Sequence, residues 1–141
     1  LAVFGAPLDD PEHGRHAIES ALAMGETLAG LNRRWQAEGL PPLRMGLGIH
    51  TGEVFAGNVG RAGKVKYAVV GDTVNLASRV EGLNKELGTT MLVTEAAYRA
   101  AGLDLVVHDR GPISVKGREE PVRVYEVLGL RPVASPGGSK P

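Results

Sequence analysis

The chain has 141 residues, 43% of them hydrophobic, which is enough for one domain with its own core. Its 16 Lys and Arg residues balance its 16 Asp and Glu residues, which argues against nonspecific nucleic-acid binding and against binding to anionic membranes. The absence of cysteine excludes a disulfide framework and a thiolate metal site, and no apolar run is long enough to span a bilayer.

The first forty residues predict a short strand and a long helix. Residues 1–4 are apolar and read as a strand that ends at the Gly5-Ala6-Pro7 segment. Acidic residues followed by proline, Asp9-Asp10-Pro11, are typical of a helix start. Apolar residues then recur at helical spacing, so we expect a helix that runs to about Glu38.

Residues 43–59 alternate between apolar and polar side chains and predict a hairpin that turns at Thr51-Gly52. His50 lies at this bend, and without a visible acidic or nucleophilic partner it favours a structural role. Residues 60–66 form a basic loop. Its cationic side chains either face phosphates or are simply solvated.

Residues 66–80 predict a strand, a Gly-Asp turn and a helix. Asn75 and Arg79 are four residues apart, so they lie on one face of that helix, and Asp72 is placed to cap its first turn. An amide beside a guanidinium suits an anion such as phosphate, because the guanidinium is a planar fork of donors that is always charged. The alternative is the solvated face of an ordinary amphipathic helix.

The remaining sequence predicts a strand at residues 90–94, a helix at 94–101, a strand at 103–107 and a last hairpin that pairs 114–116 with 122–128. Lys116 then lies at a strand end, as a phosphate ligand or as a charge that protects a sheet edge. Residues 131–141 are rich in Pro, Gly and Ser and predict a flexible tail or linker. Together these elements indicate an α+β fold, a mostly antiparallel sheet with helices on one face.

Four segments in this order resemble the catalytic domains of the class III adenylate and guanylate cyclases: residues 1–7, 47–60, 67–79 and 110–117. The resemblance covers about residues 1–129, so we predict a partial cyclase domain over residues 1–130. It implies a ferredoxin-like fold, incomplete at its amino terminus, with a sheet edge and an apolar face left uncovered.

The resemblance also implies an activity, the conversion of ATP to 3′,5′-cyclic AMP and pyrophosphate for second-messenger signalling. In this family the active site lies at a dimer interface, formed with a second copy or a complementary cyclase domain. By motif position, Asn75 and Arg79 are the catalytic pair and Lys116 binds the triphosphate. Two divalent metal ions, Mg or Mn, are implied as cofactors. Their aspartate ligands are expected upstream of residue 1, because Asp9 and Asp10 read as turn residues.

Two positions depart from the family pattern. Gly46 stands where an arginine often reaches the phosphates. Arg44, two residues earlier, either partly substitutes for that arginine or is a surface residue, and we favour the second interpretation. Ala68 stands at the base-selecting position and offers no hydrogen bond to a base, which leaves the backbone of Val70 to read the base edge. ATP is the expected substrate. The alternatives are a guanylate cyclase and a non-catalytic nucleotide-binding or dimerisation module. For this segment we expect a cytoplasmic location, with no nucleic-acid partner and no direct membrane contact.

Overall fold

The computed structural model describes residues 1–132, so most of the predicted tail, residues 133–141, lies outside the described residues. Within residues 1–132 the chain forms three α-helices and six β-strands. The elements in chain order are α1 (His13–Ala37), β1 (Leu47–Ile49), β2 (Phe55–Arg61), β3 (Lys64–Val70), α2 (Asp72–Leu87), β4 (Met91–Thr94), α3 (Glu95–Ala101), β5 (Leu105–Ile113) and β6 (Val122–Leu130).

Four strands form the main sheet in the order β1-β4-β6-β5. The β1–β4 pair is parallel, and the β4–β6 and β5–β6 pairs are antiparallel. The predicted α+β class with a mostly antiparallel sheet is therefore confirmed. It follows from sequence because hydrophobic periodicity switches between the strand and helix patterns along the chain.

The helices cover both faces of the sheet, so their predicted restriction to one face is wrong. Alternate residues of a strand point to opposite faces, and the two central β4 residues, Leu92 and Val93, are both fully buried. Leu92 packs in a cluster with Leu76 and Val80 of α2. On the other face, Val93 packs with residues of α1 and α3.

The hairpin predicted at residues 43–59 is also wrong. β1 pairs in parallel with β4, whereas the real hairpin joins β2 to β3 across the segment that was expected to be a basic loop. Gly63, the second of the two connecting residues, has φ of 82°, a left-handed conformation that glycine adopts readily. The Ala62-Gly63 turn lacks the Asn-Gly or Asp-Gly sequence that would have marked it.

Two smaller predictions also fail. Residues 1–4 form no strand, and Leu1 is 90% exposed. β5 continues to Ile113, well past the predicted end at residue 107, even though it contains Gly111 and Pro112. Proline is tolerated there because β5 is an edge strand, and the ladder shifts register between Asp109 and Gly111.

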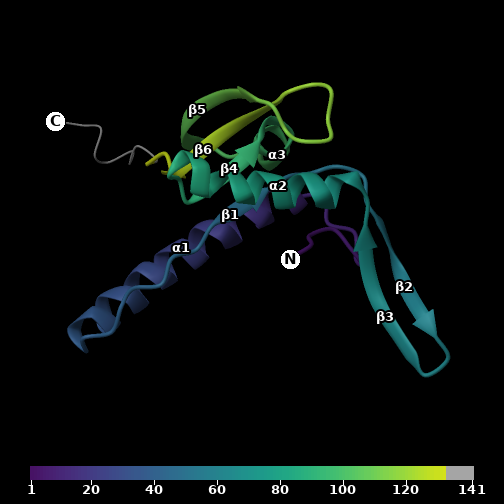
Figure 1. Cartoon of the computed structure of the whole chain (residues 1–141), viewed down its shortest axis with the longest axis horizontal. Coiled ribbons are helices and arrows are strands. Elements are labelled where there is room, and N and C mark those ends of the chain that lie inside the picture. Colours follow the sequence, from purple (N-terminus) through teal and green to yellow (C-terminus); the bar gives the residue numbers. More distant parts are fainter. Residues whose placement is uncertain (133–141) are drawn as a thin grey trace, which may run out of the picture.

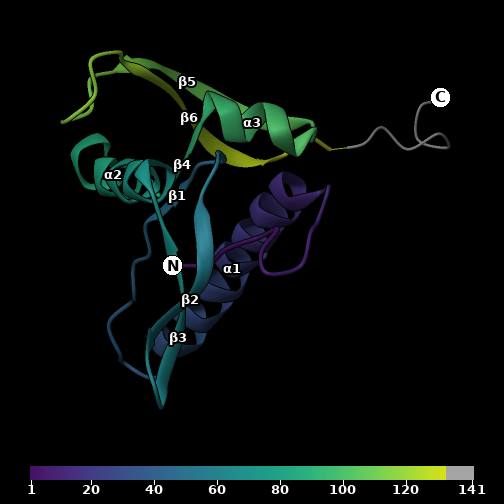
Figure 2. The same ribbon diagram turned by 90° about the vertical axis from the view of Figure 1, so that its right-hand side faces the viewer.

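The β2–β3 hairpin extends away from the main sheet, and α1 extends from it at another angle (Figures 1 and 2). On the hairpin, Phe55, Val59 and Val70 are 80%, 61% and 55% exposed. Phe55 pairs with Val70, and Val59 lies four residues along the same strand, so all three project from one face. This projecting apolar face is called the hairpin face below.

A second open apolar region lies beside β1, the edge strand of the sheet. It is a cavity of about 1210 Å³ bordered by residues from the chain start, α1, β1 and α2. Its position matches the expectation that a sheet edge and an apolar face are left uncovered.

Candidate active site

α2 positions Asn75 and Arg79. Gly71, with φ of 138°, turns the chain from β3 into the helix, a conformation that other residues rarely adopt. Leu76 and Val80, at 2% and 0% exposure, then anchor one stripe of the helix in the core. Asn75 and Arg79 each precede one of these anchors by a single position, so they lie side by side on the exposed flank. The predicted shared face is present.

Asp72 does not cap this helix as predicted. Gly71 is the N-cap, and no side chain accepts a hydrogen bond there. Asp72 is instead the first helical residue, where its charge still interacts favourably with the helix dipole, and its carboxylate pairs with the guanidinium of Arg118.

Lys116 lies in a turn, not at the end of a strand as predicted. The backbone N–H of Arg118 donates to the carbonyl of Val115 at 3.1 Å, which closes a turn with Lys116 and Gly117 at its centre. Gly117 has φ of 90°, the left-handed value that the third residue of a type II turn requires. Val115 is 7% exposed and packs with Leu76, so the core fixes the start of this turn. We call residues 115–118 the lysine turn.

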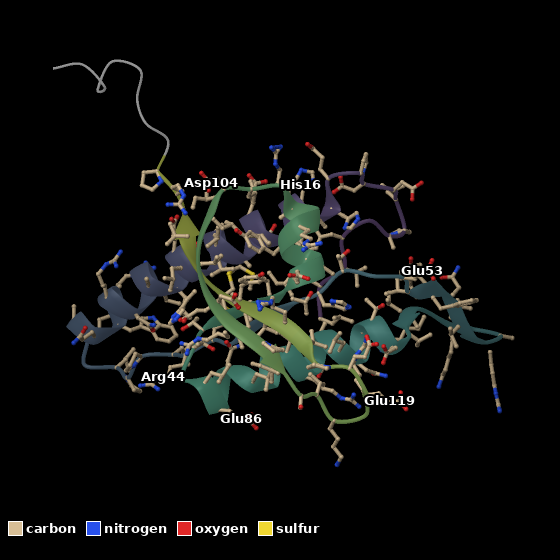
Figure 3. All side chains as sticks on the ribbon, turned by 90° about the horizontal axis from the view of Figure 1, so that it is seen from above. His16, Arg44, Glu53, Glu86, Asp104 and Glu119 are labelled. Carbon is tan, nitrogen blue, oxygen red and sulfur yellow. The ribbon has the colours of Figure 1, made fainter. Side chains whose placement is uncertain are left out.

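The lysine turn rests on the flank of α2. A Cβ atom built on Gly117 would lie 3.0 Å from Nη1 of Arg79, so the guanidinium packs directly against the glycine backbone. Two residues that are distant in sequence, Arg79 and Lys116, are thereby brought into one region. Figure 3 shows Glu119, in the loop just after the lysine turn, beside this helix.

The predicted base-contacting residues lie on β3, immediately before α2. Ala68 is half-buried and pairs with Gly57, while Val70 is 55% exposed and pairs with Phe55. Both face the same side of the hairpin as Phe55. Because β3 runs directly into α2 through Gly71, their backbone lies next to the start of the helix that carries Asn75.

The Arg44 position lies away from this region. Arg44 is exposed, and Figure 3 places it near the Glu86 end of α2, far from Glu119. A Cβ atom on Gly46 would lie 3.4 Å from the Nδ2 atom of Asn84, which is also in the last turns of α2. Arg44 is therefore a surface residue in this arrangement.

His50 forms a hydrogen bond that joins the segment after β1 to the end of β4. Its Nδ1 atom lies 2.7 Å from Oγ1 of Thr94, and the same hydroxyl caps α3 by accepting from the N–H of Ala97. Burial lowers the pKa of His50, and the positive charge of Arg118 lowers it further. The imidazole is therefore neutral at pH 7, and the Thr94 hydroxyl can donate its proton to Nδ1.

Asp10 is a turn residue, as expected from its place before α1. Its Oδ1 accepts from the N–H of Glu12 at 2.9 Å, and its Oδ2 lies 2.6 Å from Nδ1 of His16. This hydrogen bond lowers the pKa of Asp10 and raises that of His16. Asp10 is thus engaged in starting the helix.

The part of the chain that the structure describes contains no group of three or more His, Asp or Glu residues arranged to hold a metal ion. None of the described helices is long and apolar enough to cross a membrane.

The sequence alone did not identify two residues that contact the candidate site, Gly117 and Arg118. Arg118, which pairs with Asp72, was read as part of the final turn, and Gly117 was not connected with Arg79. The available signal was the Lys116-Gly117-Arg118 sequence itself, because a glycine between two cations suggests a turn that presents positive charge.

Comparison with known proteins identifies the fold. The family model for the adenylate and guanylate cyclase catalytic domain matches residues 1–129. Adenylate cyclase 1 of Rhizobium meliloti is 40% identical over 130 residues, which is 92% of this chain and 20% of that protein. The adenylate cyclase of Anabaena cylindrica is 36% identical over 119 residues, 79% of this chain and 24% of that protein.

Solved structures agree with these sequence matches. A crystallised guanylyl cyclase superimposes with a TM-score of 0.79 at 35% identity, over 91% of this chain and 64% of that one. The adenylyl cyclase CyaB from P. aeruginosa gives a TM-score of 0.78 at 30% identity, over 91% of this chain and 66% of that one. The chain thus spans about a quarter or less of these curated relatives and about two thirds of these crystallised chains. This chain belongs to the adenylate and guanylate cyclase catalytic domain family.

Proposed function

We propose that this chain supplies the Asn, Arg and Lys half of a nucleotide cyclase active site that makes 3′,5′-cyclic AMP and pyrophosphate from ATP. The observation that carries the proposal is the packing of the Arg79 guanidinium against Gly117, which puts the turn that contains Lys116 next to the helix flank that contains Asn75 and Arg79. Clustered cations next to a neutral hydrogen-bonding side chain suit a nucleoside triphosphate.

The reaction joins the ribose 3′ oxygen to the α-phosphorus and breaks the bond from that phosphorus to the bridging oxygen of pyrophosphate. The 3′ hydroxyl loses its proton, and pyrophosphate leaves with the bonding electron pair. Arg79 would stabilise the charge that spreads over the α-phosphoryl oxygens, and Lys116 would hold the remaining phosphates. Asn75, one turn before Arg79, would orient the nucleotide by hydrogen bonding.

The two divalent ions implied by the family need carboxylate ligands, and residues 1–132 contain no group of three or more His, Asp or Glu residues that could hold a metal ion. We propose that those ligands belong to the upstream part of the domain, and that in a dimer one protomer's metal site faces the other protomer's Arg79 and lysine turn. The exposed hairpin face supports dimerisation, because apolar side chains on a projecting element are typical of an interface.

ATP is the proposed substrate because the curated relatives described above are named adenylate cyclases. Ala68 weakens this choice, since an apolar wall rejects the wrong base poorly. We therefore expect a ratio of kcat/KM values for ATP and GTP that does not exceed about 10². Replacing Ala68 with Asp, which can hydrogen-bond to a base edge, should change the ratio of kcat/KM values for ATP and GTP. It should leave the domain folded.

A second candidate function is a non-catalytic nucleotide-binding module. Gly46 and Ala68 favour it, because both lack the side-chain contact that the family pattern usually supplies. Such a module would bind ATP and release it unchanged.

The test measures cyclic AMP and cyclic GMP made from Mn²⁺-ATP and Mn²⁺-GTP. The chain is assayed alone and mixed with a related cyclase domain that keeps its metal aspartates but has Ala at its own Asn and Arg positions. Product that appears only in the mixture supports the proposed half-site. ATP binding without product in any mixture supports the non-catalytic module instead.

A further inference from the structure

The loop that carries Lys116 has little internal support. Between Val115 and the start of β6 at Val122, every residue from Lys116 to Pro121 is exposed. The core therefore fixes only the first residue of the lysine turn. An exposed loop without buried side chains samples many conformations, so a precisely placed lysine needs another restraint.

The structure provides that restraint through Arg118. Its backbone N–H closes the lysine turn on Val115, and its side chain pairs with Asp72 in the first turn of α2. The preceding residue, Gly117, packs against the guanidinium of Arg79. The loop thus meets α2 at two places, and Lys116 is the residue held between the core anchor and these two contacts.

We propose that Asp72 and Arg118 form a clamp that positions Lys116 for the triphosphate, and that neither residue contacts the nucleotide. This inference rests on the proposed function, and it assigns a role to two residues outside the predicted site. The charge of Arg118 is already neutralised by Asp72, which leaves Lys116 and Arg79 to meet the phosphates. The pair is partly exposed, with 35% of the Arg118 side chain and 69% of the Asp72 side chain accessible, so its effect is modest.

The kinetic test uses Arg118→Gln in the complemented enzyme. Loss of a partly exposed ion pair should raise KM for ATP about two- to fivefold, with little change in kcat, because a triphosphate contact is made in the ground state and the transition state alike. Asp72→Asn should do the same. Arg118→Lys should recover much of the loss.

The deciding readout is coupling to Lys116. Once Lys116→Ala has removed the positioned group, adding Arg118→Gln should raise KM no further. An equal rise in both backgrounds would show that Arg118 binds the nucleotide itself and would overturn the clamp. An unchanged KM in Asp72→Asn would overturn it as well.

Arg123→Gln is the matched control. Arg123 pairs with Asp109 at 3.0 Å and its side chain is 39% exposed, close to the exposure of Arg118, but this ion pair joins β6 to β5 and does not involve α2. Its loss should leave KM unchanged.

Amide hydrogen exchange separates failure of the clamp from failure of the proposed function. Breaking the clamp should speed exchange of the Arg118 N–H, which bonds to Val115, about two- to fivefold even if the wild-type protein makes no cyclic nucleotide. An unchanged exchange rate in Asp72→Asn and Arg118→Gln would contradict the clamp whatever the activity shows.

Discussion

The α2 flank and the β2–β3 hairpin are neighbours in sequence but differ in how the fold supports them. α2 is anchored by buried Leu76 and Val80, and the lysine turn packs against it. The hairpin projects from the domain and leaves large apolar side chains in solvent. The chain's own core thus holds one region in place, whereas the other has apolar surface that a folded monomer does not bury.

This contrast corresponds to the two requirements of the proposed shared active site, which are residues that act on the substrate and residues that bind the partner. Residues that act on a charged substrate must be held rigidly before binding. Buried Leu76 and Val80 anchor α2 in the core and so hold its exposed flank in place. Residues that recruit a partner must stay accessible, and the hairpin face is exposed in this way. Substitutions in the two regions should therefore have different consequences.

Leu76→Ala should give the largest effect on folding. Leu76 is 2% exposed and links α2 to β4, β6 and Val115, so truncation leaves a cavity under both Arg79 and the lysine turn. We expect a loss of about 2–5 kcal/mol in the free energy of unfolding, measured by denaturant titration. Leu128→Ala is the control, because Leu128 is 61% exposed and should change stability by less than about 0.5 kcal/mol.

Val59→Asp should act on association and leave the domain folded. Val59 lies on the hairpin face, and a carboxylate placed in an apolar interface is desolvated without a compensating partner. We expect at least about a tenfold rise in the dimer dissociation constant, measured by analytical ultracentrifugation. Leu128→Asp is closely matched, because Leu128 and Val59 are both 61% exposed. Equal weakening by both substitutions would contradict a specific role for the hairpin.

The smallest expected effect is the pH dependence due to His50. Its pKa is lower in the folded chain than the ordinary value of 6.5, so the folded state resists protonation. The contribution of neutral His50 to the free energy of unfolding is then fully present above about pH 6.5 and declines as the pH falls toward the folded pKa. His50→Gln should make the melting temperature fall less steeply as the pH is lowered from 7.

His16 provides a control of opposite sign. Asp10 raises the pKa of His16, so its contribution is present below about pH 6.5 and is lost as the pH rises through the raised value. His16→Gln should therefore steepen the decline on acidification. If both variants changed the curve in the same direction, the assigned causes would be wrong.

The sequence predicted best where local pattern and tertiary packing agree. Buried Leu76 and Val80 recur at helical spacing, so α2 and the shared flank of Asn75 and Arg79 followed directly from periodicity. The α+β class followed in the same way. The order of motifs correctly indicated the cyclase family.

Predictions failed where long-range pairing decides the structure. β1 pairs with β4, more than forty residues away, and nothing in residues 43–59 shows that this parallel partner exists. The weak Ala62-Gly63 turn concealed the true hairpin. Likewise, the Asp72–Arg118 pair joins two segments whose proximity depends on the whole sheet, so local sequence could not reveal it.

The most direct test of the half-site is Arg79→Ala in the mixture with the metal-competent partner. Arg79 lies on the exposed flank of α2, so its loss should leave the fold intact while lowering kcat about 10²–10³-fold. The control is Arg99→Ala, because Arg99 is 77% exposed on α3 and pairs with Glu95 in the same helix; it should retain full activity. If Arg79→Ala were as active as the wild-type chain, the central claim would be contradicted.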